Sequence, residues 1–443
     1  SKMIINNWNK YKDDLKRIIE ETKNGKKIIV PFGLLSLIDD PEIHLKNSKI
    51  FAQNITPTLS GDYKKDINEN LIRIGYFSAD FNKHAVSHLI FKMLCLHDKK
   101  KFKIYCYSYG FDQMDDLHKS IKEKVDIYRD IRDISDHDVA LLARKDGIDI
   151  AIDLQGYTDK HRVNIFANRA APLQVNYLGY PGSMGVDFID YIIADRNLIP
   201  DDNQKFFSEK IIFLPHQYQV QNNELQISEI TPTKKDLGLP EDYFVYCAIN
   251  NTYKISPKMF DIWMRLLGKV EKSVLWLLDN NPSSRQNLIN EAKSRGIEKD
   301  RLVFSKRTTN ENYLAQFKHA DVYLDTFVYN AGATASNALF MGVPVITKIG
   351  KSYTARMASS LLRSIDLPEL ITTSPEDYEK LAFELSTNPE KLKKIKNKLA
   401  VNRIKKPLFN TEMFTLYFEK GLEQIFDNYI KGKDPQNIYV NEN

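Results

Sequence analysis

One stretch restricts the fold more than any other: residues 319–348 read as strand, loop, helix and strand. Val322 to Leu324 is a short apolar run, Thr334 to Met341 has helical spacing, and Val343 to Thr347 is rich in β-branched residues. A helix placed between two strands so close in sequence connects parallel neighbours. The stretch therefore predicts a βαβ unit within a parallel sheet.

The turn before this helix, Tyr329 to Thr334, carries small residues. Backbone N–H groups are open where a helix begins, and the positive end of the helix dipole faces outward there. At the carboxyl end of a strand such a turn suits an anion, and a phosphate-bearing ligand is the natural candidate. The alternative is that Gly332 and its small neighbours only allow the helix to pack closely on the sheet. The turn alone leaves both interpretations open.

Strands and helices alternate regularly from Arg73 onward. A first series runs from Arg73–Asp80 to Lys210–Pro215, and a second series begins at Tyr243. The polar stretch Gln217–Pro240 between them has no periodic pattern, so it is the best domain boundary. A chain of 443 residues also exceeds what one hydrophobic core usually serves. We therefore predict an α/β protein with two Rossmann-like, doubly wound domains that face a cleft.

The opening segment has helical patterns at Trp8–Lys23 and Glu42–Phe51, and the polar stretch Asn54–Asn70 reads as a linker. The predicted organisation has three parts. Residues 1–70 form a helical N-terminal segment with its linker, residues 71–222 form the first Rossmann-like domain, and residues 223–443 form the second with its closing helices.

Composition excludes several classes of protein. A hydrophobic content of 42% and a charged content of 27% are ordinary for a globular chain, and the net charge of +5 implies no strong polyanion partner such as nucleic acid. The basic run Lys391–Lys406 has Leu and Ile at helical spacing, which favours a solvated helix face. Three cysteines without paired spacing, Cys95, Cys106 and Cys247, indicate a reducing compartment. Because no signal peptide or long apolar span is evident, we expect a cytoplasmic protein without a membrane span.

Familiar catalytic motifs are missing from the sequence. It contains no GxxxxGK[ST], no GxGxxG after a strand, and no Cys/His cluster at metal-ligand spacing, so P-loop phosphoryl transfer and dinucleotide redox lose support. The strand YFVYCAI instead ends in NNTYKISP, where Lys254 precedes a helix that Ser256 can cap, with Pro257 at its first position. A cation there suits a diphosphate leaving group. The alternative is a surface lysine beside a helix start, and both interpretations stay open.

Several motifs together resemble one known family. In chain order they are RIGYFSADFNKHAVSHL, LQGYTDKHRVNIFANRAAPLQVNYLGYPGSMG, DYIIAD, FFSEKIIFLP, NNTYKISP, SVLWLL, HADVYLDT and PLFNTEMF. From Arg73 to its end the chain resembles the catalytic region of the protein O-GlcNAc transferase and SPINDLY family, which are nucleotide-sugar enzymes of GT-B architecture. The opening segment is similar to the stretch that precedes this region in bacterial members, and the helical-hairpin repeats of many members are not in this sequence.

The resemblance implies roles for individual residues. Lys254 matches the family lysine that contacts the diphosphate, and Asn251 a polar position near the same phosphates. Tyr313 and the backbone near Thr308 fall where members bind the base. His84, in FNKHAVSH, matches the family histidine that faces the donor sugar; it acts either as general base for an acceptor hydroxyl or as a positioning group, and we favour positioning.

The sequence departs from the family pattern in the turn described above. Many members read NxHTT followed, after two intervening residues, by Asp. This chain has Gly332 at the histidine position, Ala333 at the first threonine, the retained Thr334, and Asn337 at the ribose-binding aspartate. Backbone donors to phosphate survive these changes. A neutral amide at Asn337 accepts more weakly from ribose hydroxyls than a carboxylate does.

The resemblance implies an inverting, metal-independent transferase that moves a sugar, GlcNAc from UDP-GlcNAc, to Ser or Thr hydroxyls of protein. It implies no cofactor beyond the UDP-sugar co-substrate, and its partners are a nucleotide sugar and a protein acceptor. Two alternatives stay open: a catalytically impaired relative that binds partner proteins, or an active enzyme with another donor, such as UDP-glucose or a GDP-sugar. Retention of His84, Lys254 and Thr334 favours an active enzyme.

Overall fold

The structure, a computed structural model, describes residues 2–59, 63, 71–110 and 115–442. The chain divides into two units, each with its own parallel sheet. The first-sheet unit comprises Ile18–Leu34, Asp40–Asn223 and Asn410–Asn443. The second-sheet unit comprises Ser1–Arg17, Leu35–Asp39 and Glu224–Phe409. Within the described ranges, no helix is both long enough and apolar enough to cross a membrane.

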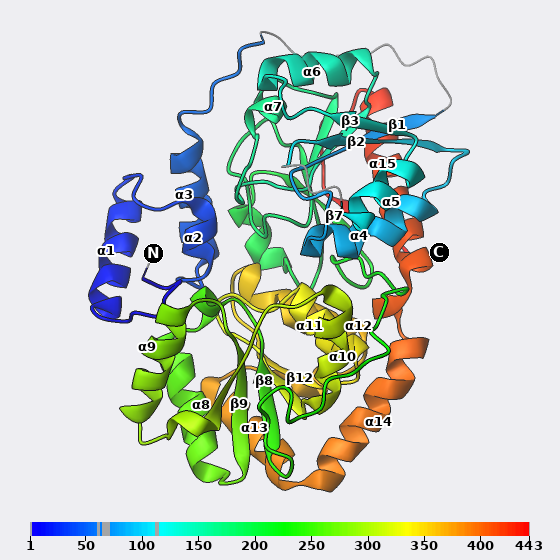
Figure 1. The fold of residues 1–443 in the computed structure, drawn as a ribbon. Helices are drawn as coiled ribbons and strands as arrows, with labels where there is room; N and C mark the ends of the chain where they lie inside the picture. Colours follow the sequence, from blue (N-terminus) through cyan, green and yellow to red (C-terminus); the bar gives the residue numbers. More distant parts are fainter. Residues whose placement is uncertain (1, 60–62, 64–70, 111–114, 443) are drawn as a thin grey trace. The chain divides into compact units, whose positions relative to one another are not determined.

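The first-sheet unit is built on eight parallel strands in the order β14-β7-β6-β5-β4-β1-β2-β3. Figure 1 shows its C-terminal helix, α15, in red beside the cyan strands. The strands are β1 (Ile72–Ser78), β2 (Phe102–Ser108), β3 (Ile127–Asp130), β4 (Ile150–Asp153), β5 (Leu173–Asn176), β6 (Tyr191–Asp195), β7 (Lys210–Leu214) and β14 (Ile438–Tyr439). The helices are α3 (Pro41–Ala52), α4 (Ala85–Leu96), α5 (Asp116–Lys124), α6 (Asp136–Lys145), α7 (Asn164–Ala167) and α15 (Thr411–Ile430). Helices α1 (Tyr11–Lys23) and α2 (Pro31–Leu35) contain the points where the chain passes between units.

The second-sheet unit has six parallel strands in the order β10-β9-β8-β11-β12-β13. They are β8 (Phe244–Ala248), β9 (Ser273–Leu278), β10 (Leu302–Ser305), β11 (Val322–Leu324), β12 (Val345–Lys348) and β13 (Ile371–Thr372). Its helices are α8 (Pro257–Lys269), α9 (Pro282–Lys293), α10 (Asn310–Gln316), α11 (Ala333–Phe340), α12 (Met357–Ser364), α13 (Pro375–Thr387) and α14 (Pro389–Lys405). The 3₁₀ turn η2 (Thr252–Lys254) lies between β8 and α8.

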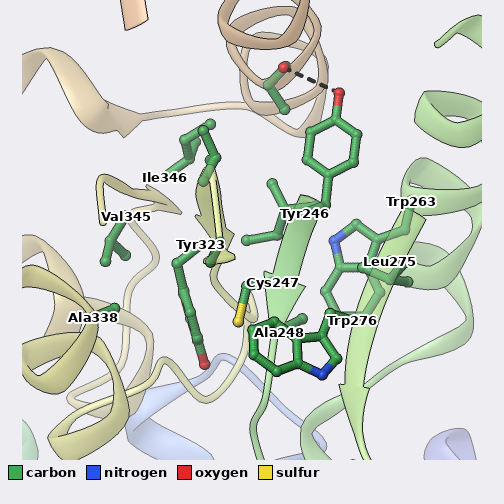
Figure 2. Close-up of a cluster of buried hydrophobic side chains, with 14 of the residues drawn as sticks. Tyr246, Cys247, Ala248, Trp263, Leu275, Trp276, Tyr323, Ala338, Val345 and Ile346 are labelled. Carbon is green, nitrogen blue, oxygen red and sulfur yellow. Dashed lines mark hydrogen bonds between the residues drawn. The ribbon is translucent and has the colours of Figure 1, made fainter. Parts of the chain in front are cut away.

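Burial of apolar strands in a hydrophobic core stabilises the second sheet. Its strands are buried on both faces, as continuous apolar runs predict for a parallel sheet. Figure 2 shows Tyr246 and Cys247 of β8, Trp276 of β9 and Tyr323 of β11 packed in this core, with Trp263 of α8 beside them. The core therefore fixes β8 and β11 as neighbours at the centre of the sheet.

Local capping explains where helices begin. Ser256 Oγ accepts a hydrogen bond from the Met259 N–H at the start of α8, and Pro257 occupies the first turn. Asn281 caps α9 and Ser374 caps α13 in the same way, each followed by proline. These caps set the direction in which each helix leaves the carboxyl end of a strand.

The division into units differs from the predicted domains in two places. The predicted boundary at 222/223 lies beside the observed one at Asn223/Glu224, but residues 410–443 pack with the first sheet. The cause is α15 and β14, because β14 pairs with β7 and Gly421 of α15 approaches Ile212 of that strand. Residues 1–17 pack with the second sheet, since Met3 and Trp8 are buried in its core. Most of the predicted linker Asn54–Asn70 lies outside the described residues.

Candidate functional site

The strand order of the second sheet marks the position between β8 and β11 as a candidate ligand site. The chain runs outward from β8 through β9 to β10, then returns to the other side of β8 for β11, β12 and β13. In open α/β sheets, ligands bind where the order reverses, at the carboxyl ends of the strands. At this edge, η2 follows β8, and the segment 325–332 follows β11 and leads into α11. Of the predicted donor-binding residues, Lys254 ends η2 and Gly332 ends the segment 325–332. Ala333, Thr334 and Asn337 follow in α11.

Lys254 lies within this edge and is not a solvated lysine. Its side chain is buried, and the residue is only 9% exposed. Nζ donates a hydrogen bond to the Asn330 carbonyl at 3.0 Å and lies 3.8 Å from the centroid of the Tyr329 ring. Burial lowers the pKa of Lys254 to about 8, while the nearby Asp325 carboxylate opposes that shift. The alternative of a surface lysine beside a helix start is therefore wrong.

Asp325, which the sequence reasoning missed, organises the segment after β11. Its carboxylate accepts hydrogen bonds from Thr326 N–H at 2.8 Å, Ala331 N–H at 2.7 Å and Thr347 Oγ1–H at 2.6 Å. Burial raises the pKa of Asp325, although these bonds and Lys254 favour the charged form. The segment that presents the Asn330 carbonyl to Lys254 is thus folded around one buried carboxyl. The available signal was an aspartate at the carboxyl end of a strand, in HADVYLDT.

Two buried polar atoms at this edge have no hydrogen-bond partner among the described residues: Asn330 Oδ1 and Asn250 Nδ2. Buried polar groups in proteins are nearly always paired, so this acceptor and this donor are available to a polar ligand. Asn330 is anchored through its other amide atom, because Nδ2 donates to the Thr326 carbonyl at 2.6 Å. The residue is therefore held while Oδ1 remains available.

The N-terminus of α11 carries the altered turn. Gly332 is the N-cap, and no side chain caps the helix; Ala333 and Thr334 form its first turn. The side chain of Thr334 interacts with the Tyr313 side chain of α10 and lowers its pKa, against the larger rise caused by burial. Asn337 lies one turn further along the helix and is half-buried. The structure therefore joins four predicted donor-site residues, Tyr313, Gly332, Ala333 and Thr334, at one helix end, with Asn337 following on the same helix.

An arginine missed by the sequence reasoning joins the remaining predicted positions. Arg307 follows β10, and its Nη2 donates to Asn251 Oδ1 at 3.2 Å and to Asn280 Oδ1 at 3.1 Å. Its neighbour Thr308 is exposed, and Thr309 caps α10, the helix that carries Tyr313. Asn251 is therefore tied to the loop after β10. The sequence signal for Arg307 is the basic pair Lys306 and Arg307 directly before Thr308.

His84 belongs to the first-sheet unit, where it follows β1 and is the N-cap of α4. Its Nδ1 accepts from the Val86 N–H at 3.4 Å and lies 3.4 Å from Asp80 Oδ2, and nearly half of the side chain is exposed. If Nδ1 accepts from the backbone, the proton of the neutral ring sits on Nε2. If Nδ1 instead donates to the Asp80 carboxylate, which lies at the same distance, Nε2 is left as a proton acceptor. The geometry is therefore compatible with both the positioning role and the general-base role.

No group of three or more His, Cys, Asp or Glu side chains suited to a metal ion occurs in the part of the chain that the structure describes. The charges of the site come from Lys254, Arg307 and the α11 N-terminus, against the single carboxyl of Asp325. The arrangement can hold an anion of high charge density and stabilise negative charge that develops on it.

Comparison with known proteins gives consistent matches. The profile described as Glycosyl transferase family 41 matches residues 49–231 and 219–418. The probable UDP-N-acetylglucosamine–peptide N-acetylglucosaminyltransferase SEC of Arabidopsis thaliana is 29% identical over 433 residues, covering 94% of this chain and 44% of that protein. The probable SPINDLY transferase of Eustoma exaltatum subsp. russellianum is 31% identical, covering 85% of this chain and 41% of that protein. The chain thus spans less than half the length of these curated relatives.

A solved structure also matches, over most of the length of both chains. A lysine-to-methionine mutant of the O-GlcNAc transferase of Thermobaculum terrenum superposes with a TM-score of 0.80 at 27% identity, covering 91% of this chain and 78% of that one. The family resemblance and the GT-B fold class predicted from the sequence are confirmed by these matches.

Proposed function

The chain belongs to glycosyl transferase family 41, and from this premise we propose that it transfers GlcNAc from UDP-GlcNAc to Ser or Thr hydroxyls of a protein acceptor. The names of its relatives, UDP-N-acetylglucosamine–peptide N-acetylglucosaminyltransferases, support this donor and a peptide acceptor. The observation that carries the proposal is the buried ammonium of Lys254, which follows β8 and donates to the Asn330 carbonyl in the segment that leads from β11 into α11. This placement suits the diphosphate of a nucleotide sugar.

The proposed chemistry is a single displacement at the anomeric carbon. The acceptor oxygen forms the new bond to that carbon as the bond to the diphosphate oxygen breaks, so the configuration inverts and UDP leaves with the bonding electron pair. The hydroxyl proton passes to a base, directly or through water. Lys254 and the N–H groups of the α11 N-terminus stabilise the charge that accumulates on UDP. A metal ion is not needed for this step if these groups supply the compensating charge.

The proposal is tested by transfer from a panel of radiolabelled nucleotide sugars to protein in a lysate, with and without EDTA. We expect label transfer from UDP-GlcNAc that survives EDTA. Transfer from UDP-glucose or a GDP-sugar alone would replace the donor assignment. Transfer lost in EDTA and restored by manganese or magnesium would contradict metal independence, and no transfer from any donor would favour the protein-binding alternative.

Asn337 offers a test of the nucleotide. If the site takes a UDP-sugar and Asn337 stands in place of a ribose-binding carboxylate, Asn337→Asp should restore charge-assisted hydrogen bonds to the ribose. Such bonds are roughly twice as strong as neutral ones, so UDP affinity should rise by about 1 kcal/mol before any loss to desolvation. Calorimetry with UDP and GDP on both proteins measures this. Unchanged or weaker UDP binding in the variant, together with tight GDP binding in the wild type, would exclude UDP-GlcNAc.

The pKa of Lys254 predicts an alkaline limit to activity. The ammonium is charged below its pKa of about 8 in the free protein, so kcat/KM should fall as the pH rises through about 8. A bound diphosphate favours the charged form, so kcat should persist to higher pH than kcat/KM does. Lys254→Arg keeps a charge at every pH in this range, so the alkaline limb, the fall of kcat/KM above about pH 8, should disappear from the activity that remains. A limb that persists in this variant would assign it to another group.

A further inference from the structure

The turn that carries Lys254 is held by residues from the far end of the sequence. Thr252 begins η2, and its carbonyl accepts hydrogen bonds from the Ile255 N–H at 3.0 Å and from Asn6 Nδ2 at 2.8 Å. Its hydroxyl donates to the Ile4 carbonyl at 3.0 Å. Thr252 is thus bonded through both its polar side-chain atom and its carbonyl to a segment nearly 250 residues earlier. We call residues 2–9 the N-terminal strap.

The strap is seated on the second-sheet unit at several points besides Thr252. Asn287 Nδ2 of α9 donates to the Ile5 carbonyl at 2.8 Å, and Asn281 Nδ2 donates to the Ile4 carbonyl at 3.2 Å. Trp8 is buried against Phe260 of α8, with ring centroids 5.4 Å apart. The Ile4 carbonyl also accepts from Thr252, whereas the contacts of Ile5 and Trp8 can be altered without touching the turn of Lys254.

Asn6 is the centre of the strap. It is 1% exposed, and its φ of 50° lies in the left-handed region, which Asn and Asp tolerate better than other side chains except glycine. Its Oδ1 accepts from Ser284 Oγ–H of α9, and its Nδ2 donates to Thr252. The Asn6 side-chain amide is buried, and both its oxygen and its nitrogen form hydrogen bonds. Because the backbone conformation is also restricted, Asn6 defines the position of the atoms that it contacts.

We propose that Asn6 is a positioning residue for Lys254: through the Thr252 carbonyl, it fixes the 3₁₀ turn from which the ammonium reaches the Asn330 carbonyl and the leaving diphosphate. The inference rests on the proposed function of Lys254. Thr252 and Lys254 are the first and last residues of one three-residue turn, so a shift of the first displaces the second. Displacement of a catalytic group by about 1 Å can lower a rate a hundredfold.

The test uses Asn6→Asp, which keeps the side-chain shape, the tolerance for a left-handed φ and the acceptor for Ser284, but loses the N–H donor to Thr252. We expect kcat to fall about tenfold or more, with less than a threefold change in UDP affinity measured by calorimetry. The alkaline limb of kcat/KM should also move to higher pH, because a less confined Lys254 is better solvated. A purely structural role would lower the melting temperature without moving this limb.

Two controls isolate the proposed contact. Asn7→Asp adds the same charge to the adjacent position and keeps the acceptor for the Asn9 N–H, so it should retain kcat and the limb. Asn287→Ala weakens docking of the strap at Ile5 without touching Thr252, so it should lower stability but spare the pH profile. Wild-type kcat and pH profile in Asn6→Asp, while Lys254→Ala is inactive, would overturn this inference alone. Normal turnover in Lys254→Ala would instead overturn the proposed function.

Discussion

Replacing Lys254 with alanine should lower kcat by about a hundredfold or more at saturating donor while leaving the protein folded. Removing one group that stabilises developing charge typically costs a few kcal/mol in the transition state. Lys254 is buried with a pKa lowered to about 8, so the native state already disfavours its charge, and losing that charge should not unfold the unit. Initial rates with UDP-GlcNAc and thermal unfolding measure the two effects separately.

The matched control for this variant is Lys254→Met. Methionine keeps an unbranched stem that can pack against the Tyr329 ring but removes the ammonium that donates to the Asn330 carbonyl. Both variants should therefore lose turnover, and the methionine variant should be the more stable of the two. If either variant turns over at a near-native rate with saturating donor, the leaving-group role of Lys254 is excluded.

Local signals explain which elements could be predicted. The start of α8 at Pro257 and the strand Val322–Leu324 are predicted to the residue, because a cap, a proline and a continuous apolar run act within a few positions. Helix α5 (Asp116–Lys124) and strand β3 (Ile127–Asp130) were missed. The helix is polar, and the short strand lies at the edge of its sheet with little burial. Strand β14 has two residues, and only its pairing with distant β7 defines it.

The candidate site likewise contains residues with a local sequence signal and residues without one. Lys254 and the start of α11 could be predicted because a motif and a helix boundary mark them in the sequence. The sequence marks the positions of Asp325 and Arg307 but not their roles. Asp325, Arg307 and Asn6 each bond to a partner distant in the sequence, which only the tertiary structure brings close. Asn6 was assigned to a separate N-terminal segment, whereas its hydrogen bonds belong to the second-sheet unit.

Replacing His84 with alanine should lower the rate about a hundredfold and leave UDP affinity almost unchanged. His84 belongs to the first-sheet unit, whereas the residues proposed to hold the nucleotide belong to the second. Alanine also removes the cap of α4, so a loss of rate in this variant alone has two possible causes. Calorimetry with UDP and a donor-saturated rate assay are the required measurements, and a collapse of UDP affinity would contradict the assignment of His84.

His84→Asn separates the two causes, because asparagine is a favoured N-cap but carries no imidazole. If the imidazole orients the acceptor or the sugar through Nε2–H, the asparagine variant should keep the stability of the wild type and remain as slow as the alanine variant. Recovery of the rate would reduce the role of His84 to capping α4. The pH profile decides between positioning and base catalysis: a general base produces an acidic limb of kcat that disappears with the imidazole, whereas a positioning group leaves that limb in place.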